Sequence, residues 1–333
     1  MHLPAFDYIR PRSDKELCQI LSDHGMETLV VAGGTDLFPR MKKGVTNRRI
    51  LVDLKGIRGL QGVAEKGGEV LLGATLTLTA LEKSTEMRKD MFALSQSAGR
   101  VGVTQLRNMG TIGGNLCQET RCWYYSQGPF WRRVNPPCFK RDGDRCYVVK
   151  GGDRCHAMFC GDMAPALIAS GASLILKSRE GERKLLVEDF YTGDGKEPLN
   201  LNPGEFLSRV VIQKDPSRKE VYLKLTARQT AGFPGVGVAA SLHRVDGYCR
   251  DLKIAVTSVG PKPIRLKETE RSLEGKRIES PVLEEVARFA YEEVHPVAFM
   301  GVGAAYRKKM VGVMVKRALE LLSNIEGGKT PTT

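Results

Sequence analysis

The sequence predicts an α+β protein made of two successive parts, and three observations support this prediction. The chain has 333 residues, which is too long for one small domain and suits two or three modest ones. Its first two thirds mix helical and strand-like segments and twice run into a glycine turn. Its last third has the spacing of antiparallel strands followed by two helices. We therefore expect one domain over residues 1–216, a C-terminal α+β domain over 217–326 and a tail at 327–333.

The first part opens with clear signals for a helix and a strand. Ser13 and Glu16 have the spacing of a capping box, and Gly25 marks the end of the helix. The apolar run at 28–32 predicts a buried strand, which leads directly into the turn Gly33-Gly34-Thr35-Asp36. Further strands are predicted at 51–54 and 69–73, and further helices at 77–82 and 91–101.

The middle of the chain is unusual in composition. Residues 102–116 are rich in glycine and end in Gly110-Thr111-Ile112-Gly113-Gly114-Asn115-Leu116. Residues 117–160 have little periodicity and hold six of the eight cysteines. Beyond them, the pattern predicts a helix at 164–169, strands at 172–177, 207–212, 221–225, 236–243 and 252–259, and closing helices at 281–294 and 304–322.

Composition narrows the classes of function. The sequence has no run of eighteen apolar residues that would predict a membrane span, and its N-terminus lacks the pattern of an export signal. We therefore expect a cytoplasmic protein. The 51 basic and 38 acidic residues give a net charge of +13. Because the basic residues are scattered and are not gathered in a stripe with aromatic residues, we expect an acidic protein partner and not nucleic acid.

The two glycine turns are candidate phosphate-binding sites. A turn without Cβ atoms lets backbone N–H groups approach phosphate oxygens closely. Two such turns would grip a pyrophosphate from two sides, with hydroxyl donors from Thr35 and Thr111 and an amide from Asn115. Taken singly, each motif is weak evidence, because a Gly-Gly pair more often marks an ordinary tight turn. Neither matches the G-x-G-x-x-G or P-loop pattern, so the common nucleotide-binding folds are not indicated.

The crowded cysteines predict metal or redox chemistry, since a chain without an export signal is not expected to form disulfides. Four of them are candidate ligands, separated by 15, 7 and 8 residues: Cys122, Cys138, Cys146 and Cys155. By spacing alone, four thiolates suit zinc and an iron–sulfur cluster equally. The many Arg and Lys residues around them favour the cluster, because nearby cations stabilise its negative charge. Structural zinc stays an alternative.

The two glycine motifs carry a family resemblance. The segment Val31-Ala32-Gly33-Gly34-Thr35-Asp36-Leu37 and the segment 111–116 resemble the two flavin-binding signatures of the FAD subunits of the xanthine dehydrogenase (molybdenum hydroxylase) family. Similarity at 105–108, 161–165 and 222–224 and in the last helix extends the resemblance over nearly the whole chain. It implies an FAD-binding domain of the PCMH/vanillyl-alcohol-oxidase type, followed by an α+β domain of the CO-dehydrogenase flavoprotein type with an antiparallel sheet and helices.

The resemblance also implies roles for individual residues. Asp162 would accept a hydrogen bond from the ribose end of FAD, and Lys224 would lie near the isoalloxazine; a helix cap and a solvated strand lysine are the alternatives. The pyrophosphate would be held by the backbone of Val31, Ala32, Gly33, Gly34, Thr35, Asp36 and Leu37, with further contacts from Thr111, Gly114 and Asn115.

The cysteine-rich insertion is similar to that of the FAD (beta) subunits of 4-hydroxybenzoyl-CoA reductases, which hold a 4Fe–4S cluster. The resemblance implies that Cys122, Cys138, Cys146 and Cys155 are the ligands and that Cys117 and Cys160 are buried thiols outside the cluster.

The function that this resemblance implies is electron transfer. Electrons would pass from a ferredoxin-type donor through the 4Fe–4S cluster and FAD towards a small subunit with two 2Fe–2S clusters and a molybdopterin-binding large subunit. 4-Hydroxybenzoyl-CoA would be reduced there to benzoyl-CoA, as in anaerobic aromatic degradation, in a heterohexamer. This chain would carry no catalytic residue. The alternatives are an NAD-using hydroxylase of the xanthine or aldehyde dehydrogenase type and a non-enzymatic zinc-binding interaction module.

Overall fold

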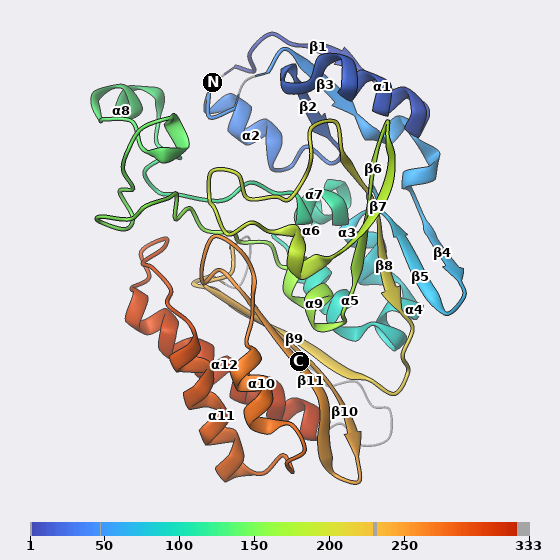
Figure 1. Ribbon diagram of the computed structural model, residues 1–333, viewed down its shortest axis with the longest axis vertical. Helices are drawn as coiled ribbons and strands as arrows, with labels where there is room; N and C mark the ends of the chain where they lie inside the picture. Colours follow the sequence, from blue (N-terminus) through green and yellow to red (C-terminus); the bar gives the residue numbers. More distant parts are fainter. Residues whose placement is uncertain (1, 47, 229–231, 325–333) are drawn as a thin grey trace.

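The computed structural model describes residues 2–46, 48–228 and 232–324, and the predicted tail at 327–333 lies outside them. In this part of the chain the strands form a three-stranded, a five-stranded and a four-stranded sheet. Figure 1 shows the three-stranded sheet at one end of the molecule and the C-terminal helices at the other. Among the described helices, none is long and apolar enough to cross a membrane.

The N-terminal sheet is parallel and has the order β1 (Asp7–Ile9), β3 (Ile50–Asp53), β2 (Thr28–Val31). Helix α1 (Asp14–His24) packs Leu17 and Leu21 into the core beside this sheet. Its predicted ends are confirmed: the Ser13 hydroxyl accepts the Glu16 N–H at 3.2 Å, and Gly25 adopts a φ of +41°. The Glu16 carboxylate returns to the N–H of Arg12 at 2.8 Å, one residue before the cap.

The five-stranded sheet is antiparallel, with the order β4-β5-β8-β6-β7. Between β5 and β6 the chain leaves this sheet and forms all but the first of the helices named below. The strands are β4 (Val63–Lys66), β5 (Glu69–Gly73), β6 (Ser173–Ser178), β7 (Gly181–Leu186) and β8 (Phe206–Gln213). The helices are α2 (Leu37–Lys42), α3 (Leu78–Lys83), α4 (Thr85–Asp90), α5 (Phe92–Gly99), α6 (Thr104–Met109), α7 (Ile112–Leu116), α8 (Pro129–Val134) and α9 (Met163–Ala169).

The C-terminal part is an antiparallel sheet with helices, as the sequence predicts. The sheet has the order β12 (Ile264–Arg265), β11 (Tyr248–Thr257), β10 (Val236–Val245), β9 (Lys219–Leu225). Helices α10 (Lys267–Leu273), α11 (Ser280–Glu293) and α12 (Ala304–Ser323) form a core with Val238, Ile254 and their neighbours. Ala239 points the other way and packs with Ala93 of α5 and Ala166 of α9. The sheet is therefore buried on both faces, which explains its nearly continuous apolar strands.

The main difference from prediction lies in residues 102–116, where the sequence indicated a glycine-rich turn. The structure has two short helices there, α6 and α7. Thr111 caps α7, because its hydroxyl accepts the N–H of Gly114 at 3.1 Å. The pair Gly113-Gly114 therefore lies in the first turn of a helix.

Candidate functional site

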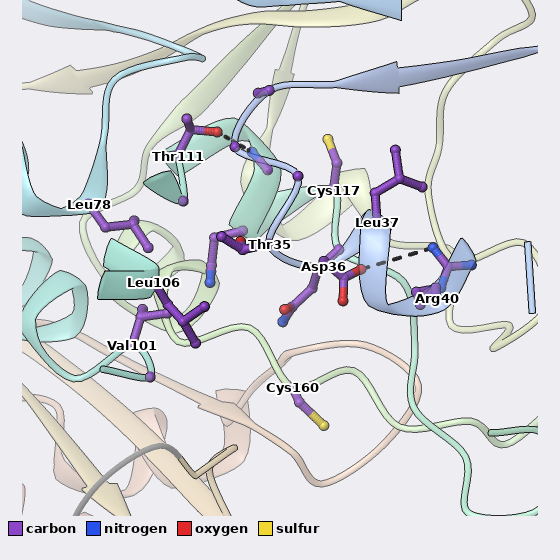
Figure 2. A pocket seen from close by; sticks show the side chains of 18 of the residues that line it. Thr35, Asp36, Leu37, Arg40, Leu78, Val101, Leu106, Thr111, Cys117 and Cys160 are labelled. Carbon is purple, nitrogen blue, oxygen red and sulfur yellow. Dashed lines mark hydrogen bonds and ion pairs between the residues drawn. The ribbon is translucent and has the colours of Figure 1, made fainter. Parts of the chain in front are cut away.

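A pocket of about 480 Å³ lies where the turn after β2 meets the loop between α6 and α7. Figure 2 shows Thr35, Asp36 and Leu37 on one side of it and Thr111, Leu78 and Leu106 on the other. The predicted residues that line this pocket are Val31, Ala32, Gly33, Gly34, Thr35, Asp36, Leu37, Thr111, Gly114, Asn115 and Asp162. Segments separated by some 75 residues in the sequence thus line one pocket from two sides, as the two glycine motifs suggested.

Glycine is required where the two motifs touch. A Cβ on Gly33 would lie 2.0 Å from the carbonyl oxygen of Met109, so no other residue fits without moving that backbone. Gly34 has a φ of +69°, and a Cβ there would lie 2.3 Å from the Phe38 ring. The backbone of the first turn therefore lies directly against the second loop and faces the pocket with no side chain between.

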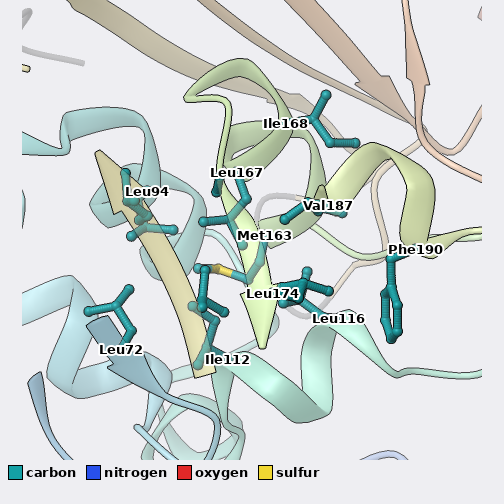
Figure 3. Packing of buried hydrophobic residues seen from close by; sticks show 14 of the residues in the cluster. Leu72, Leu94, Ile112, Leu116, Met163, Leu167, Ile168, Leu174, Val187 and Phe190 are labelled. Atoms are coloured by element: carbon teal, nitrogen blue, oxygen red, sulfur yellow. The ribbon is translucent and has the colours of Figure 1, made fainter. Parts of the chain in front are cut away.

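The core below the pocket fixes the second loop. Figure 3 shows Ile112 and Leu116 of α7 packed against Met163 and Leu167 of α9. Asn115 is 8% exposed, and its side-chain oxygen links the same two helices by accepting the Met163 N–H at 3.1 Å. Thr111 and Asn115 thus shape the loop through their own hydrogen bonds as well as lining the pocket.

Asp162 and Lys224 form a buried ion pair at the edge of this site. The carboxylate of Asp162 lies 3.0 Å from Nζ of Lys224 and accepts the Tyr222 hydroxyl at 2.6 Å. Burial raises the pKa of Asp162, and Lys224 and Tyr222 offset part of that effect. Lys224 also donates to the Arg100 carbonyl at 2.7 Å. It lines an adjoining pocket and not the first one.

The surroundings of Asp162 and Lys224 bear on their alternative roles as a helix cap and a solvated lysine. Asp162 does stand at the N-cap of α9, but its side chain makes no capping hydrogen bond. Lys224 is not a solvated strand lysine, since its side chain is only 4% exposed. Their predicted contacts with FAD stay predictions.

Several lining residues were not predicted. Arg40 lies 4.0 Å from Asp36, and Arg121 also pairs with Asp36. The spacing of Asp36 and Arg40, four residues apart around the start of α2, was a signal that could have identified that pair. Arg121 has no such local signal. Gln118 also lines the pocket, and its Nε2 atom is buried without a hydrogen-bond partner among the described residues.

The pocket fits an FAD molecule in its chemistry. Bare backbone amides at Gly33 and Gly34 and the donor on Gln118 suit a pyrophosphate and other acceptors. Three apolar side chains, Leu78 of α3, Val101 of the loop after α5 and Leu106 of α6, suit flat rings.

The six clustered cysteines divide between two sites. Cys117 and Cys160 line the pocket described above, and burial raises the pKa of each thiol to about 12. The other four line one small cavity in the insertion: Cys122, Cys138, Cys146 and Cys155. These four are the predicted ligands. All are free thiols, and no group of His, Cys, Asp or Glu in the described ranges is arranged to hold a metal ion.

The cavity contains groups that stabilise thiolates. Burial raises the pKa of Cys122, while the backbone N–H groups of Tyr125 and Tyr124 lower it. Burial likewise raises the pKa of Cys155 to about 11, although the N–H of Ala157 and the charge of Lys140 each lower it. Thiols, N–H donors and a nearby cation are the kinds of group that iron–sulfur and zinc sites use.

Comparison with known proteins identifies the two parts of the chain. Residues 4–214 match the FAD binding domain in molybdopterin dehydrogenase, and residues 221–322 match the CO dehydrogenase flavoprotein C-terminal domain. The carbon monoxide dehydrogenase medium chain of Afipia carboxidovorans is 28% identical over 316 residues, which cover 95% of this chain and 96% of that protein. The aldehyde oxidoreductase FAD-binding subunit PaoB of Escherichia coli K12 is 32% identical over 261 residues, covering 73% of this chain and 78% of that protein.

A solved structure gives the same result. Reconstituted CO dehydrogenase from Oligotropha carboxidovorans contains a chain that superposes with a TM-score of 0.80 at 28% identity, covering 97% of this chain and 99% of that one. The fold and the pocket therefore define an FAD-binding flavoprotein with a PCMH-type domain. More particularly, the chain belongs to the family of FAD-binding medium subunits of molybdenum hydroxylases, and is an oxidoreductase subunit.

Proposed function

We propose that this chain is the FAD- and 4Fe–4S-binding electron-transfer subunit of a cytoplasmic, molybdenum-containing 4-hydroxybenzoyl-CoA reductase. The observation that carries the finer part of this proposal is the convergence of Cys122, Cys138, Cys146 and Cys155 on one cavity. Electron transfer is the chemistry that the two groups supply when bound.

The contribution of the chain is to hold and orient these groups. In this proposal the backbone of residues 31–37 binds the pyrophosphate, and Thr111, Gly114 and Asn115 close the pocket from the second loop. Asp162 meets the ribose end, and Lys224, fixed by Asp162 and the Arg100 carbonyl, lies near the isoalloxazine. The four cysteines ligate the cluster. Lys140 and Arg145 line the same cavity, and their positive charges favour an anionic iron–sulfur centre there.

The remainder of the reaction belongs to partner chains. We place the substrate on a molybdopterin-binding large subunit, with a small subunit carrying two 2Fe–2S clusters between it and this chain, in a heterohexamer. The names of the relatives, a medium chain and an FAD-binding subunit, support such an assembly. The net charge of +13 suits an acidic electron donor of the ferredoxin type.

Analysis of the purified full-length chain tests the proposal. Prepared without oxygen, it should hold about one FAD, four irons and four acid-labile sulfides, with flavin absorption and a broad iron–sulfur band. Cys146→Ser should lose the iron and keep the FAD, whereas Cys249→Ser, which removes a buried thiol far from the cavity in sequence, should keep both.

The outcomes separate the alternatives. Flavin without iron would favour an NAD-using hydroxylase of the xanthine or aldehyde dehydrogenase type. Colourless protein with stoichiometric zinc would identify a zinc-binding module. If iron is present, the assembled complex with a low-potential reductant should convert 4-hydroxybenzoyl-CoA to benzoyl-CoA. Failure to form this product would refute the substrate assignment.

A further inference from the structure

A chain of ion pairs connects the flavin pocket to the four-cysteine cavity. Arg40 lines the flavin pocket, and its Nη2 lies 2.9 Å from Oε2 of Glu119. The other oxygen of Glu119, Oε1, lies 2.7 Å from Nζ of Lys140, which lines the four-cysteine cavity. Glu119 itself lines neither space. One carboxylate therefore joins a cation of one site to a cation of the other.

The three side chains are shielded enough for their charges to matter. Their exposed fractions are 19% for Arg40, 22% for Glu119 and 5% for Lys140. Lys140 is also held in place by the Gly195 carbonyl at 2.8 Å and by the Thr120 hydroxyl. Charges with little access to water are screened much less than surface charges. A change of charge at one end is consequently felt at the other.

The order of the charges sets the sign of this effect. From the flavin pocket towards the four-cysteine cavity, the charges are positive at Arg40, negative at Glu119 and positive at Lys140, and the thiols follow. Negative charge gained in the cysteine cavity attracts Lys140 and leaves more of the Glu119 charge to neutralise Arg40. Arg40 then offers less positive charge to an anion in the flavin pocket.

We infer that Arg40, Glu119 and Lys140 form an electrostatic link by which the charge of the four-cysteine site regulates the affinity of the flavin pocket for FAD. This inference rests on the proposed flavin site and names Glu119 as a positioning residue that touches neither cofactor. It assigns the insertion a second role, because the insertion then tunes flavin binding as well as holding thiols.

Titration of flavin-depleted full-length chain with FAD tests the link. Lys140→Met leaves Glu119 wholly on Arg40 and should weaken FAD binding about fivefold, the lower end of typical coupling between sites. Glu119→Gln leaves Arg40 with only its longer, 4.0 Å contact to Asp36 and should tighten binding by a similar factor. In the Glu119→Gln background, Lys140→Met should change the dissociation constant by less than about twofold, because the connection is already broken.

The opposite signs distinguish a link from a merely structural role. If the three residues only supported the fold, both single changes would weaken FAD binding, and that result would overturn the inference. The inference would also be overturned if Lys140→Met weakened FAD binding in the Glu119→Gln background. Lys140→Arg keeps the charge and should bind FAD as the parent does, which covers the case in which Lys140→Met does not fold.

A matched control is the exposed pair Lys184–Glu69, with an N–O distance of 2.8 Å and side chains 52% and 36% exposed. Lys184→Met should leave the FAD dissociation constant within about twofold. Iron, sulfide and zinc analysis of the same preparations is a separate readout. Zinc in place of iron would refute the proposed cluster, while the signs in the FAD titrations would still decide the link.

Discussion

Gly33 shows how one absent side chain sets the form of the flavin pocket. Its backbone lies so close to the loop before α7 that a Cβ would stand 2.0 Å from the Met109 carbonyl oxygen and 2.9 Å from Cα of Gly110. The two turns that face each other across the pocket therefore depend on this contact. A larger residue pushes them apart even where it makes no contact with the ligand.

Gly33→Ala should weaken FAD binding by roughly 5- to 150-fold, since overpacking of this kind costs about 1–3 kcal/mol. FAD fluorescence titration of the full chain measures it. Gly59→Ala is the matched control, because a Cβ at Gly59 meets nothing within 4 Å and its φ is ordinary. Equal affinities for the two variants would show that the turns do not bind the cofactor.

At this scale, sequence reasoning succeeds where the signal is local. The capping pattern at Ser13 predicted the start of α1, and the glycine pairs indicated the backbone that lines the pocket. It failed where partners are distant. Arg40 and Glu119 are 79 residues apart, and no periodicity or spacing relates them. Their meeting depends on how the insertion folds back over α2.

The insertion is held as an element by few but specific contacts. The backbone N–H groups of Arg121 and Met158 each donate to the other's carbonyl at 2.7 Å, which closes its base. Further out, Arg132 is 9% exposed and donates to the carbonyls of Lys43 and Gly44 at 3.0 and 2.9 Å. It also donates to Gln127 within the insertion at 2.6 Å. Arg132 thus ties α8 to the turn after α2.

Arg132→Met should loosen the insertion without unfolding the rest of the chain. Losing several hydrogen bonds from one charged group costs on the order of 3 kcal/mol, which corresponds to about a 100-fold loss of amide protection for residues 125–147. Hydrogen exchange read by mass spectrometry measures this peptide by peptide. Arg133→Met, at the exposed neighbouring position, should leave protection unchanged. Similar exchange in both variants would contradict the anchoring role.

Elements differed in how well their sequences predicted them. The strands β9, β10 and β11 and the helices α11 and α12 were expected because each is long enough to show its period. Short elements such as β1, α2, α4 and β12 were not expected. Equally short elements such as β2, β3 and β5 were expected, because each contains an apolar run. An element of six residues or fewer without such a run carries too little periodicity, and tertiary packing stabilises it more than its own propensity does.

Over the whole molecule, the two parts meet across a polar seam within an otherwise apolar contact. Besides the Asp162–Lys224 pair, the Gln96 side chain accepts the Tyr222 N–H at 2.9 Å, and Ser241 donates to the Ala169 carbonyl at 2.5 Å. Small residues, Ala93, Ala166 and Ala169, let α5 and α9 approach the sheet closely. The sequence predicted a sheet and helices on each side, but not this seam, since its partners come from segments more than 60 residues apart.

Glu220 at this seam makes the stability of the molecule depend on pH. Its carboxylate accepts the N–H of Ala93, at the start of α5, at 2.8 Å. Burial raises the pKa of Glu220 to about 7, and the N–H groups of Ala93 and Leu94 and the charge of Arg218 only partly oppose this. In the unfolded chain the carboxyl titrates near its ordinary value of 4.5. Between these values the folded state binds more protons than the unfolded state, so stability falls as pH rises.

Glu220→Gln removes the titration while its amide oxygen can still accept the Ala93 N–H. The free energy of unfolding of the parent, relative to Glu220→Gln, should therefore fall by on the order of 2 kcal/mol between pH 5 and pH 8, allowing for the partial exposure of the residue. Urea denaturation of both proteins with saturating FAD measures this difference. Glu285→Gln, at an exposed carboxylate, should give curves parallel to the parent's. A difference that stays constant, or grows in favour of the parent with rising pH, would show that the seam admits the charged carboxylate without cost.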